Sequence, residues 1–157
     1  AITQNLEYRA QSLGLSAALT SDSEVSVYDV ILYLSDDDRP IYVNVKSAFA
    51  GGRTNKDDIS KAEGLRDFLD EDKDRQLFIT TFNINFRNDM AIVLEDCVVM
   101  PVAWLPDIYV NPSNNGNLQS SHYKDLDGAT QRTTEQFLDC LVKEMENARK
   151  KRDAKQK

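Results

Sequence analysis

Two β-strand patterns joined by a short polar turn limit most strongly how this 157-residue chain can fold. Residues 24–34 are dense in β-branched and aromatic side chains, which favour strands. Residues 41–46 alternate apolar and polar side chains, the pattern of a strand with two unlike faces. Residues 35–40 between them are turn formers followed by a proline, so we expect a hairpin loop there.

The polar and apolar residues of the second strand fall on opposite faces. A period of two places three polar side chains on one face, namely Tyr42, Asn44 and Lys46. The same period places Ile41, Val43 and Val45 on the other face. Asp29 interrupts the apolar run of the first strand. We therefore expect an aspartate and a lysine to share one polar face of the sheet.

Three further segments have the period of a helix with one buried face. The first is predicted from Thr3 to Leu19. The second begins at a cap formed by Asp57 or Asp58 and continues to Leu69. The third is an amphipathic helix at about 133–151, capped by a threonine and followed by a frayed basic tail. These helices lie before, between and after the predicted strands.

The remaining patterns complete a mixed fold. Residues 76–82 read as a strand, and residues 90–102 as two short strands separated by a turn or bulge at Glu95 and Asp96. Residues 111–117 have the composition of a loop. Together the elements predict an α/β fold of α+β type, with a central mixed β-sheet flanked by helices, in a single domain of residues 1–157.

The charge balance limits the functions available to the chain. It has 26 acidic and 19 basic residues and a formal net charge of -7, which argues against non-specific coating of nucleic acid. Metal-dependent nucleases, however, place carboxylates at their centre and keep basic residues local. The local basic groups here are Arg53, Lys56 and Lys61 and, near the end, Arg149, Lys150, Lys151 and Arg152.

Several other functional classes lack the residues that they need. His122 is the only histidine, so a histidine-rich zinc site cannot form. Cys97 and Cys140 have no partner at metal-ligand spacing, which fits a reducing setting and a cytoplasmic location. No apolar run approaches the roughly 20 residues of a membrane span. We therefore expect no membrane partner. No glycine-rich phosphate loop is present, so we expect no nucleotide cofactor.

Acidic and basic residues occur in an order that suits phosphodiester hydrolysis. A helix with Glu7 is followed by a strand with Asp29, a strand ending near Lys46 and a helix with Glu63. Hydrolysis of this kind needs carboxylates that hold magnesium and a base or charge near the attacking water. We expect these elements to bring such groups to one edge of the sheet.

With this order, the chain resembles the PD-(D/E)XK nuclease superfamily, and within it the type II restriction endonucleases, from about residue 7 to about residue 119. The resemblance rests on the spacing of Asp29 from Asn44-Val45-Lys46, on the upstream helical glutamate and on the Asn-Gly-Asn-Leu-Gln segment at 115–119. It implies a restriction-endonuclease-like core and a magnesium-dependent, site-specific endonuclease for double-stranded DNA. A palindromic target would imply a homodimer.

The resemblance also implies a role for each matching residue. Asp29, the main-chain carbonyl of Val45 and the carboxylate of Glu63 would bind Mg²⁺. Lys46 would lie beside the attacking water, where it polarises that water or stabilises charge on the phosphate. Glu7 would bind a second ion or orient Lys46.

One departure from the superfamily pattern bears directly on activity. Asn44 stands where the second acid normally lies, and a neutral amide is a poorer ligand for a hard cation. Tyr28, in place of a proline, is a minor difference. Three accounts of Asn44 are open: an engineered acid-to-amide change, a naturally inactive relative, or relocation of the acid to Glu63, which we favour. The alternative functions are an inactive nuclease-fold module that binds DNA or protein, or an interaction domain outside the superfamily.

Two segments are candidates for contact with DNA. Asparagine and glutamine can pair with adenine in the major groove. We expect base or backbone contacts from Asn114, Asn115, Asn117, Gln119 and Ser120. We expect contacts to phosphates from Arg53, Thr54, Asn55 and Lys56.

Overall fold

The computed structural model describes residues 2–21, 26–49, 56–89, 91–113, 116–121, 123 and 126–155. Its helices are α1 (Ile2–Arg9), α2 (Ala62–Glu71) and α3 (Thr134–Lys155), with short 3-10 helices η1 (Gln11–Leu13) and η2 (Val102–Trp104). Its strands are β1 (Leu15–Thr20), β2 (Val30–Leu34), β3 (Asp37–Phe49), β4 (Asp57–Lys61), β5 (Gln76–Phe86), β6 (Ile92–Pro101), β7 (Tyr109–Val110) and β8 (Asn117–Ser120).

The chain divides into two compact units, each built from two separate segments. Unit 1 comprises Ala1–Gly51 and Arg75–Pro101, and unit 2 comprises Gly52–Asp74 and Val102–Lys157. The predicted mixture of helices with a mixed sheet is confirmed. The predicted folding of residues 1–157 as a single nuclease domain stays a prediction.

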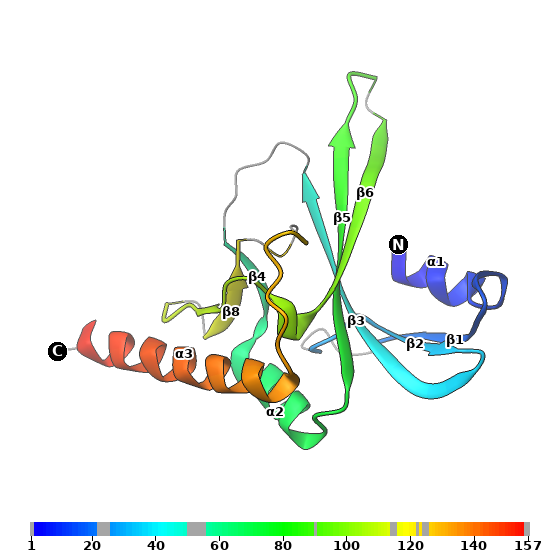
Figure 1. Cartoon of the computed structure of the whole chain (residues 1–157). Helices are drawn as coiled ribbons and strands as arrows, with labels where there is room; N and C mark the ends of the chain where they lie inside the picture. Colours follow the sequence, from blue (N-terminus) through cyan, green and yellow to red (C-terminus); the bar gives the residue numbers. More distant parts are fainter. Residues whose placement is uncertain are drawn as a thin grey trace. The chain divides into compact units, whose positions relative to one another are not determined.

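Unit 1 is a five-stranded sheet in the order β1-β2-β3-β5-β6 (Figure 1). Strands β1, β2 and β3 form an antiparallel meander, β3 pairs with β5 in parallel, and β5 and β6 form an antiparallel hairpin. Helix α1 packs against β1. The core between them contains Ala10, Ala18, Val30 and Val43, with Leu6, Leu15 and Leu32 packed against it.

The predicted helix from Thr3 to Leu19 is wrong in its second half. Helix α1 ends at Arg9, and Leu15–Thr20 forms strand β1. Gly14 has a φ of 75°, in the left-handed region that residues with a β-carbon rarely adopt, and it ends the 3-10 turn that follows α1. The chain then reverses onto the sheet, where Ala18 pairs with Leu32.

The predicted hairpin is confirmed, but its loop is shorter than expected. Only Ser35 and Asp36 form the turn, and β3 already begins at Asp37. Pro40 therefore lies within β3, at a register shift where Asp37 pairs with Leu34 and Ile41 with Leu32. A bulge tolerates a proline because its residues leave the regular hydrogen-bond ladder. Strand β2 begins at Val30, and residues 22–25 lie outside the described residues.

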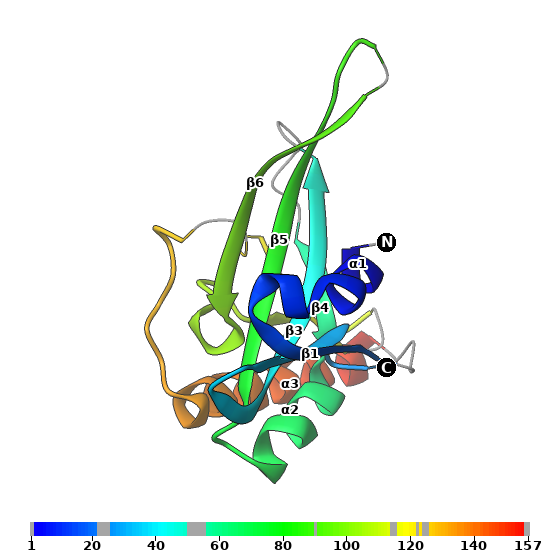
Figure 2. The same cartoon turned by 90° about the vertical axis from the view of Figure 1, so that its right-hand side faces the viewer.

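The long β5–β6 hairpin has one apolar and one polar face, and both views show it extending along one direction (Figures 1 and 2). Strand β6 is continuous, with a register shift opposite Asn83 and Ile84, so the expected irregularity at Glu95 and Asp96 is a bulge. On the polar face, Asn83 donates to Asp96 and Asn85 donates to Glu95.

The apolar face runs the length of the sheet. Towards its base a hollow of about 360 Å³ is lined by Leu6, Leu32, Ile41, Val43, Val45, Phe78, Thr80, Phe82 and Val99. Towards the tip of the hairpin, the stacked rings of Phe49 and Phe86 and the side chains of Ile92 and Leu94 are exposed. The predicted separation of apolar residues Ile41, Val43 and Val45 from Asn44 is thus confirmed, because Asn44 is absent from this hollow and is buried.

Unit 2 combines a three-stranded antiparallel sheet, in the order β4-β8-β7, with helices α2 and α3. Helix α3 packs against both α2 and β7. Its start is fixed by a capping box, in which Thr133 Oγ1 accepts from the Gln136 N–H and the Gln136 side chain accepts from the Thr133 N–H. The predicted threonine cap is therefore confirmed.

The predicted cap of the second helix is wrong. Asp57 and Asp58 lie in strand β4, and α2 begins five residues later than the cap, at Ala62. The Ala62 N–H donates to the carbonyl oxygen of Gly116 at 3.1 Å, so a loop carbonyl takes the part of a side-chain cap. Among the described residues, no helix is long and apolar enough to span a membrane.

Candidate functional site

Asp29 lies at the point where β2 begins, held on both sides by the sheet. Its N–H donates to the Val43 carbonyl at 2.8 Å, and its carbonyl accepts from the Ser21 N–H at 2.9 Å. Its exposed carboxylate turns towards β3, where Oδ2 accepts from the Val45 N–H at 2.6 Å. The fold therefore fixes the carboxylate against the Asn44-Val45-Lys46 segment, as the sequence predicts.

Asn44 is buried beside this carboxylate and has a structural part. Its Nδ2 donates to the carbonyl oxygen of Val27 at 2.9 Å. That bond ties the segment leading into Asp29 to β3. An acid at this position has no N–H to give, so the amide of Asn44 fits its surroundings in a way that an aspartate would not.

Lys46 follows in β3 and is partly buried. It pairs with Thr81 of β5, a residue with no exposed surface. The Thr81 hydroxyl has no hydrogen-bond partner among the described residues. Buried polar atoms are rarely left unsatisfied, so this hydroxyl marks an unusual polar position on the strand next to Lys46. The sequence does not reveal Thr81 because nothing local separates it from Thr80.

Glu7 lies on helix α1, which packs on the apolar face of the unit 1 sheet. Its Oε2 accepts from the Thr20 hydroxyl at 3.4 Å, and Thr20 pairs with Val30, the residue after Asp29. Unit 1 thus places Asp29 beside the Val45-Lys46 segment, whereas Glu7 contacts Thr20, the partner of the core residue Val30. This contact of Glu7 depends on β1, which the sequence does not predict.

Asp29 offers a metal ion one exposed carboxylate in unit 1. Among the described residues, no group of three or more His, Cys, Asp or Glu side chains is arranged to hold a metal. Mg²⁺, however, binds through one or two carboxylates and keeps several waters, which substrate phosphate oxygens can replace. The exposed carboxylate of Asp29 is one such ligand, and a Mg²⁺ site built on it stays a prediction.

Glu63, the predicted second acid, belongs to unit 2. It lies in the first turn of α2, its side chain is 78% exposed, and Arg66 Nη2 lies 3.8 Å from its Oε1. It lines a groove of about 480 Å³ together with Arg149 and Arg152 of α3. Its part in a metal site with Asp29 remains a prediction.

The amide-rich segment of unit 2 forms internal hydrogen bonds. Asp58 accepts from Asn117 Nδ2 at 3.0 Å and from Gln119 Nε2 at 2.6 Å. Ser120 is fully buried, and its hydroxyl donates to Asp107. In this conformation Ser120 holds Asp107 instead of facing a ligand, and among the described amides of the segment, Asn117 and Gln119 are partly exposed.

The predicted phosphate contacts fall mostly outside the described residues. Arg53, Thr54 and Asn55 lie there, as do Asn114 and Asn115. Lys56 is described and exposed, and its Nζ lies 3.8 Å from the centroid of the Tyr109 ring. Lys56 thus has an aromatic neighbour that its sequence position does not reveal.

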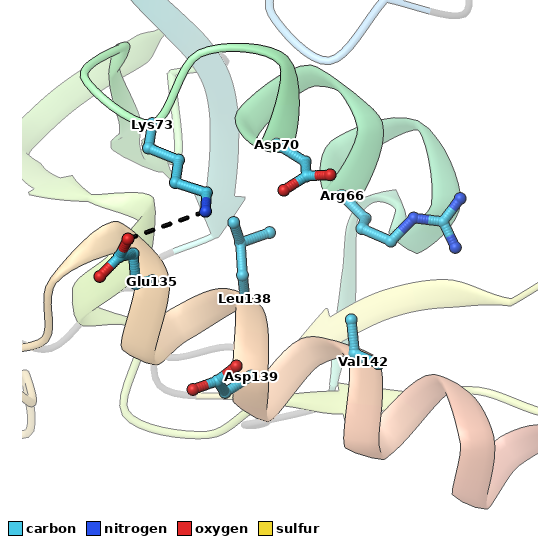
Figure 3. Close-up of a pocket in the computed structure, with 7 residues that line it drawn as sticks. All are labelled: Arg66, Asp70, Lys73, Glu135, Leu138, Asp139 and Val142. Carbon is cyan, nitrogen blue, oxygen red and sulfur yellow. Dashed lines mark ion pairs between the residues drawn. The ribbon is translucent and has the colours of Figure 1, made fainter.

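A second groove of unit 2 carries charges of both signs. It lies between α2 and α3, where Lys73 Nζ is 3.7 Å from Glu135 Oε1, and Arg66, Asp70 and Asp139 also line it (Figure 3). Because acids and bases alternate along it, the groove offers no consistent charge to a ligand. It is therefore a weaker candidate for a binding site than the edge of unit 1.

Asp37 and Tyr123 have shifted pKa values, and both shifts have structural causes. Hydrogen bonds from the side chain and backbone of Arg39 lower the pKa of Asp37 to about 2. Burial, followed by the hydrogen bond to Asp57, raises the pKa of Tyr123 well above its usual range. Neither group belongs to the predicted site. Comparison with known proteins finds no matching family model and no matching curated sequence.

Proposed function

We propose that this chain is a magnesium-dependent, site-specific endonuclease for double-stranded DNA, of the type II restriction endonuclease kind. The observation that carries the proposal is the hydrogen bond from the Val45 N–H to Asp29 Oδ2, which holds an exposed carboxylate beside the strand that bears Lys46. A carboxylate and a lysine at one sheet edge are the groups that metal-assisted phosphodiester hydrolysis needs. The family assignment rests on the sequence resemblance.

In the proposed reaction a water attacks the phosphorus atom, the bond to the leaving sugar oxygen breaks, and that oxygen takes up a proton. Bound Mg²⁺ supplies positive charge at the phosphate and lowers the pKa of water. Asp29 and the Val45 carbonyl would hold that ion, with Glu63 as the further ligand that the sequence resemblance implies. The Lys46 ammonium stabilises the charge that builds on the phosphate or polarises the water. Glu7 orients Lys46 or holds a second ion.

Plasmid cleavage tests this proposal with a change that preserves the local fold. Asp29→Asn keeps an oxygen that can accept from the Val45 N–H but removes the negative charge. We expect cleavage in Mg²⁺ or Mn²⁺ to fall by a factor of roughly 100 or more, as for loss of an essential electrostatic group. Asp36→Asn, at the exposed hairpin turn, is the matched control and should cut normally.

The lysine and the second acid are tested in the same assay. Lys46→Ala should abolish cleavage, and Glu63→Gln should do so only if the acid has moved to α2. Equal cutting by the parent chain and by Asp29→Asn would refute the proposal. A homodimer and a cytoplasmic location belong to the same proposal, and sedimentation of the chain with a palindromic duplex tests the dimer.

A catalytically inactive module that binds DNA or protein is the second candidate. The observation that favours it concerns Asn44, which stands where the superfamily has an acid. Its buried side-chain amide donates to the carbonyl oxygen of Val27. This candidate predicts DNA or protein binding that Asp29→Asn leaves unchanged, with no cleavage in either metal. Cleavage by the parent chain would exclude it.

A further inference from the structure

Two basic stretches that lie far apart in the sequence meet at Tyr109 in unit 2. Lys56 Nζ lies 3.8 Å from the centroid of the Tyr109 ring, and Lys151 Nζ lies 6.0 Å from the same centroid. Lys56 directly precedes β4, Tyr109 opens β7, and Lys151 belongs to the last turns of α3. A cation within about 6 Å of an aromatic centroid is attracted by the ring. Two ammonium groups therefore share one small surface.

The packing of α3 on β7 brings Lys151 to this place. Ala148 is buried one turn earlier in the helix, and Val110 is buried next to Tyr109 in the strand. Residues three apart lie on the same face of a helix, so Lys151 projects from the face that packs on β7. The arrangement is thus set by regular secondary structure.

The end of α3 adds more positive charge than negative. Residues 149–155 contain Arg149, Lys150, Lys151, Arg152 and Lys155 and one acid, Asp153. Arg152 Nε lies 4.0 Å from Asp153, whereas no carboxylate of a described residue forms an ion pair with Lys56 or Lys151. A chain with a net charge of -7 therefore keeps a concentrated positive surface here.

The two lysines are close enough to repel each other and to bind one polyanion together. Their distances to one ring centroid place the Nζ atoms within about 10 Å of each other, which is the Debye length at about 0.1 M salt. A row of phosphates lying over both would relieve the repulsion and release condensed counterions. Gln119, opposite Tyr109 in the sheet, donates its Nε2 to Asp58 Oδ1 at 2.6 Å, so one hydrogen-bonded carboxylate borders this face.

We propose that Lys56, Tyr109 and Lys151 form a contact with the phosphate backbone that holds double-stranded DNA on unit 2. The proposal rests on the proposed function, because it names the surface that holds the substrate of that enzyme. It adds Tyr109 and the end of α3 to the sequence-predicted contacts. It also pairs Lys56 with Lys151 in binding the phosphate backbone.

Binding without catalysis tests the contact. Fluorescence anisotropy of a labelled mixed-sequence duplex is measured in EDTA over a series of KCl concentrations. We expect the double variant Lys56→Gln, Lys151→Gln to bind roughly tenfold more weakly at about 0.1 M salt and to reduce the salt slope by about 2. The double variant Lys73→Gln, Lys143→Gln changes the charge equally in the same unit and should bind like the parent chain.

The outcomes separate this contact from the nuclease proposal. If the parent chain cuts DNA but both double variants bind alike, the contact is overturned and the nuclease stands. If the patch variant loses binding in a chain that cuts nothing, the contact stands and the nuclease fails. Absence of any DNA binding by the parent chain overturns the contact. So does salt-sensitive binding to phosphatidylserine vesicles without binding to the duplex, which would assign the surface to a membrane.

Discussion

Asn44 shows how one side-chain amide can position the chain beside a candidate site. Its Nδ2 donates to the Val27 carbonyl at 2.9 Å in a buried position. Replacing it with an acid would set a carboxyl oxygen against a carbonyl oxygen. The amide of Asn44 therefore positions the chain before Asp29, and the three accounts of its origin stay predictions.

Substitution of Asn44 tests this view. We expect Asn44→Asp to lower the free energy of unfolding by about 1–3 kcal/mol at neutral pH, because a buried acceptor loses its donor. We expect no gain of plasmid cleavage. Urea denaturation measures the change in the free energy of unfolding, and the plasmid assay measures cleavage. Asn83→Asp, in the exposed hairpin, tests whether another asparagine-to-aspartate change lowers the free energy of unfolding equally. A large gain of cleavage with unchanged stability would support an acid lost from this position.

The Asp37–Arg39 pair predicts an unusually acidic carboxyl. Arg39 Nη2 lies 2.7 Å from Asp37 Oδ2, and hydrogen bonds from the Arg39 side chain and N–H lower the pKa of Asp37 to about 2. Because the shift is downward, the pairing is complete above the ordinary aspartate pKa and is lost as the pH falls through about 2. Carboxyl chemical shifts followed by NMR should show this midpoint, and Arg39→Gln should move it up towards 3.8.

Tyr123 predicts a loss of stability at alkaline pH. Its buried hydroxyl donates to Asp57 Oδ2 at 2.6 Å, and burial is the main reason why its pKa is raised. A raised pKa means that the stabilisation is complete below the ordinary tyrosine value of about 10 and is lost above it. We expect Tyr123→Phe to cost about 1.5–3 kcal/mol at pH 7 and to flatten the alkaline loss. Tyr8→Phe, at an 89% exposed position, should change neither quantity.

At the scale of elements, the β5–β6 hairpin exposes an apolar face that is unusual for a monomer. Phe86 is 57% exposed, Ile92 is 64% exposed, and the two are paired across the hairpin. Phe49 stacks on Phe86 with ring centroids 5.4 Å apart. Contiguous apolar patches of more than a few hundred Å² are rare on monomeric proteins. This face should therefore bind apolar dyes.

Dye binding measures that exposure. We expect anilinonaphthalene sulfonate to fluoresce with the native chain, and Phe86→Ser to reduce the signal while changing the free energy of unfolding by less than about 0.5 kcal/mol. Tyr8→Ser, at an isolated exposed position on α1, should leave the signal unchanged. An unchanged signal in Phe86→Ser, or no signal from the parent chain, would show that the hairpin is covered in solution.

The elements also show which parts of the fold the sequence reveals. The β2–β3 hairpin and α3 were predictable because alternation and a capping box are local patterns. Strand β1 was not, because Leu15–Thr20 is rich in alanine and becomes a strand by pairing with β2. Strand β4 was not, because its two aspartates are held by partners far along the chain, such as Tyr123 and Asn117.

The residues of the candidate site also divide into those that the sequence reveals and those that it does not. Asp29 and Lys46 could be chosen from their spacing, since neighbouring strands of a hairpin bring such residues together. The surroundings of Glu7 could not be predicted, because its contact with Thr20 depends on the unpredicted strand β1. Thr81 has no sequence signal at all, because its burial and its position beside Lys46 follow from the parallel pairing of β3 with β5.

For the whole molecule, the interleaving of the two units matters most. Strand β3 and its parallel partner β5 belong to unit 1, but the chain between them builds β4 and α2 of unit 2. Parallel strands need a connection of a dozen or more residues, and here that connection is a part of the other unit. The chain therefore passes from one unit to the other three times.

This interleaving has a consequence for synthesis on the ribosome. When β3 has emerged, unit 1 can form only its antiparallel meander, because β5 must wait until β4 and α2 have been made. A cut within Gly52–Asp74 would leave two fragments that each carry pieces of both units. Neither fragment could complete a unit alone. The units would form only when the two fragments are mixed and bind each other.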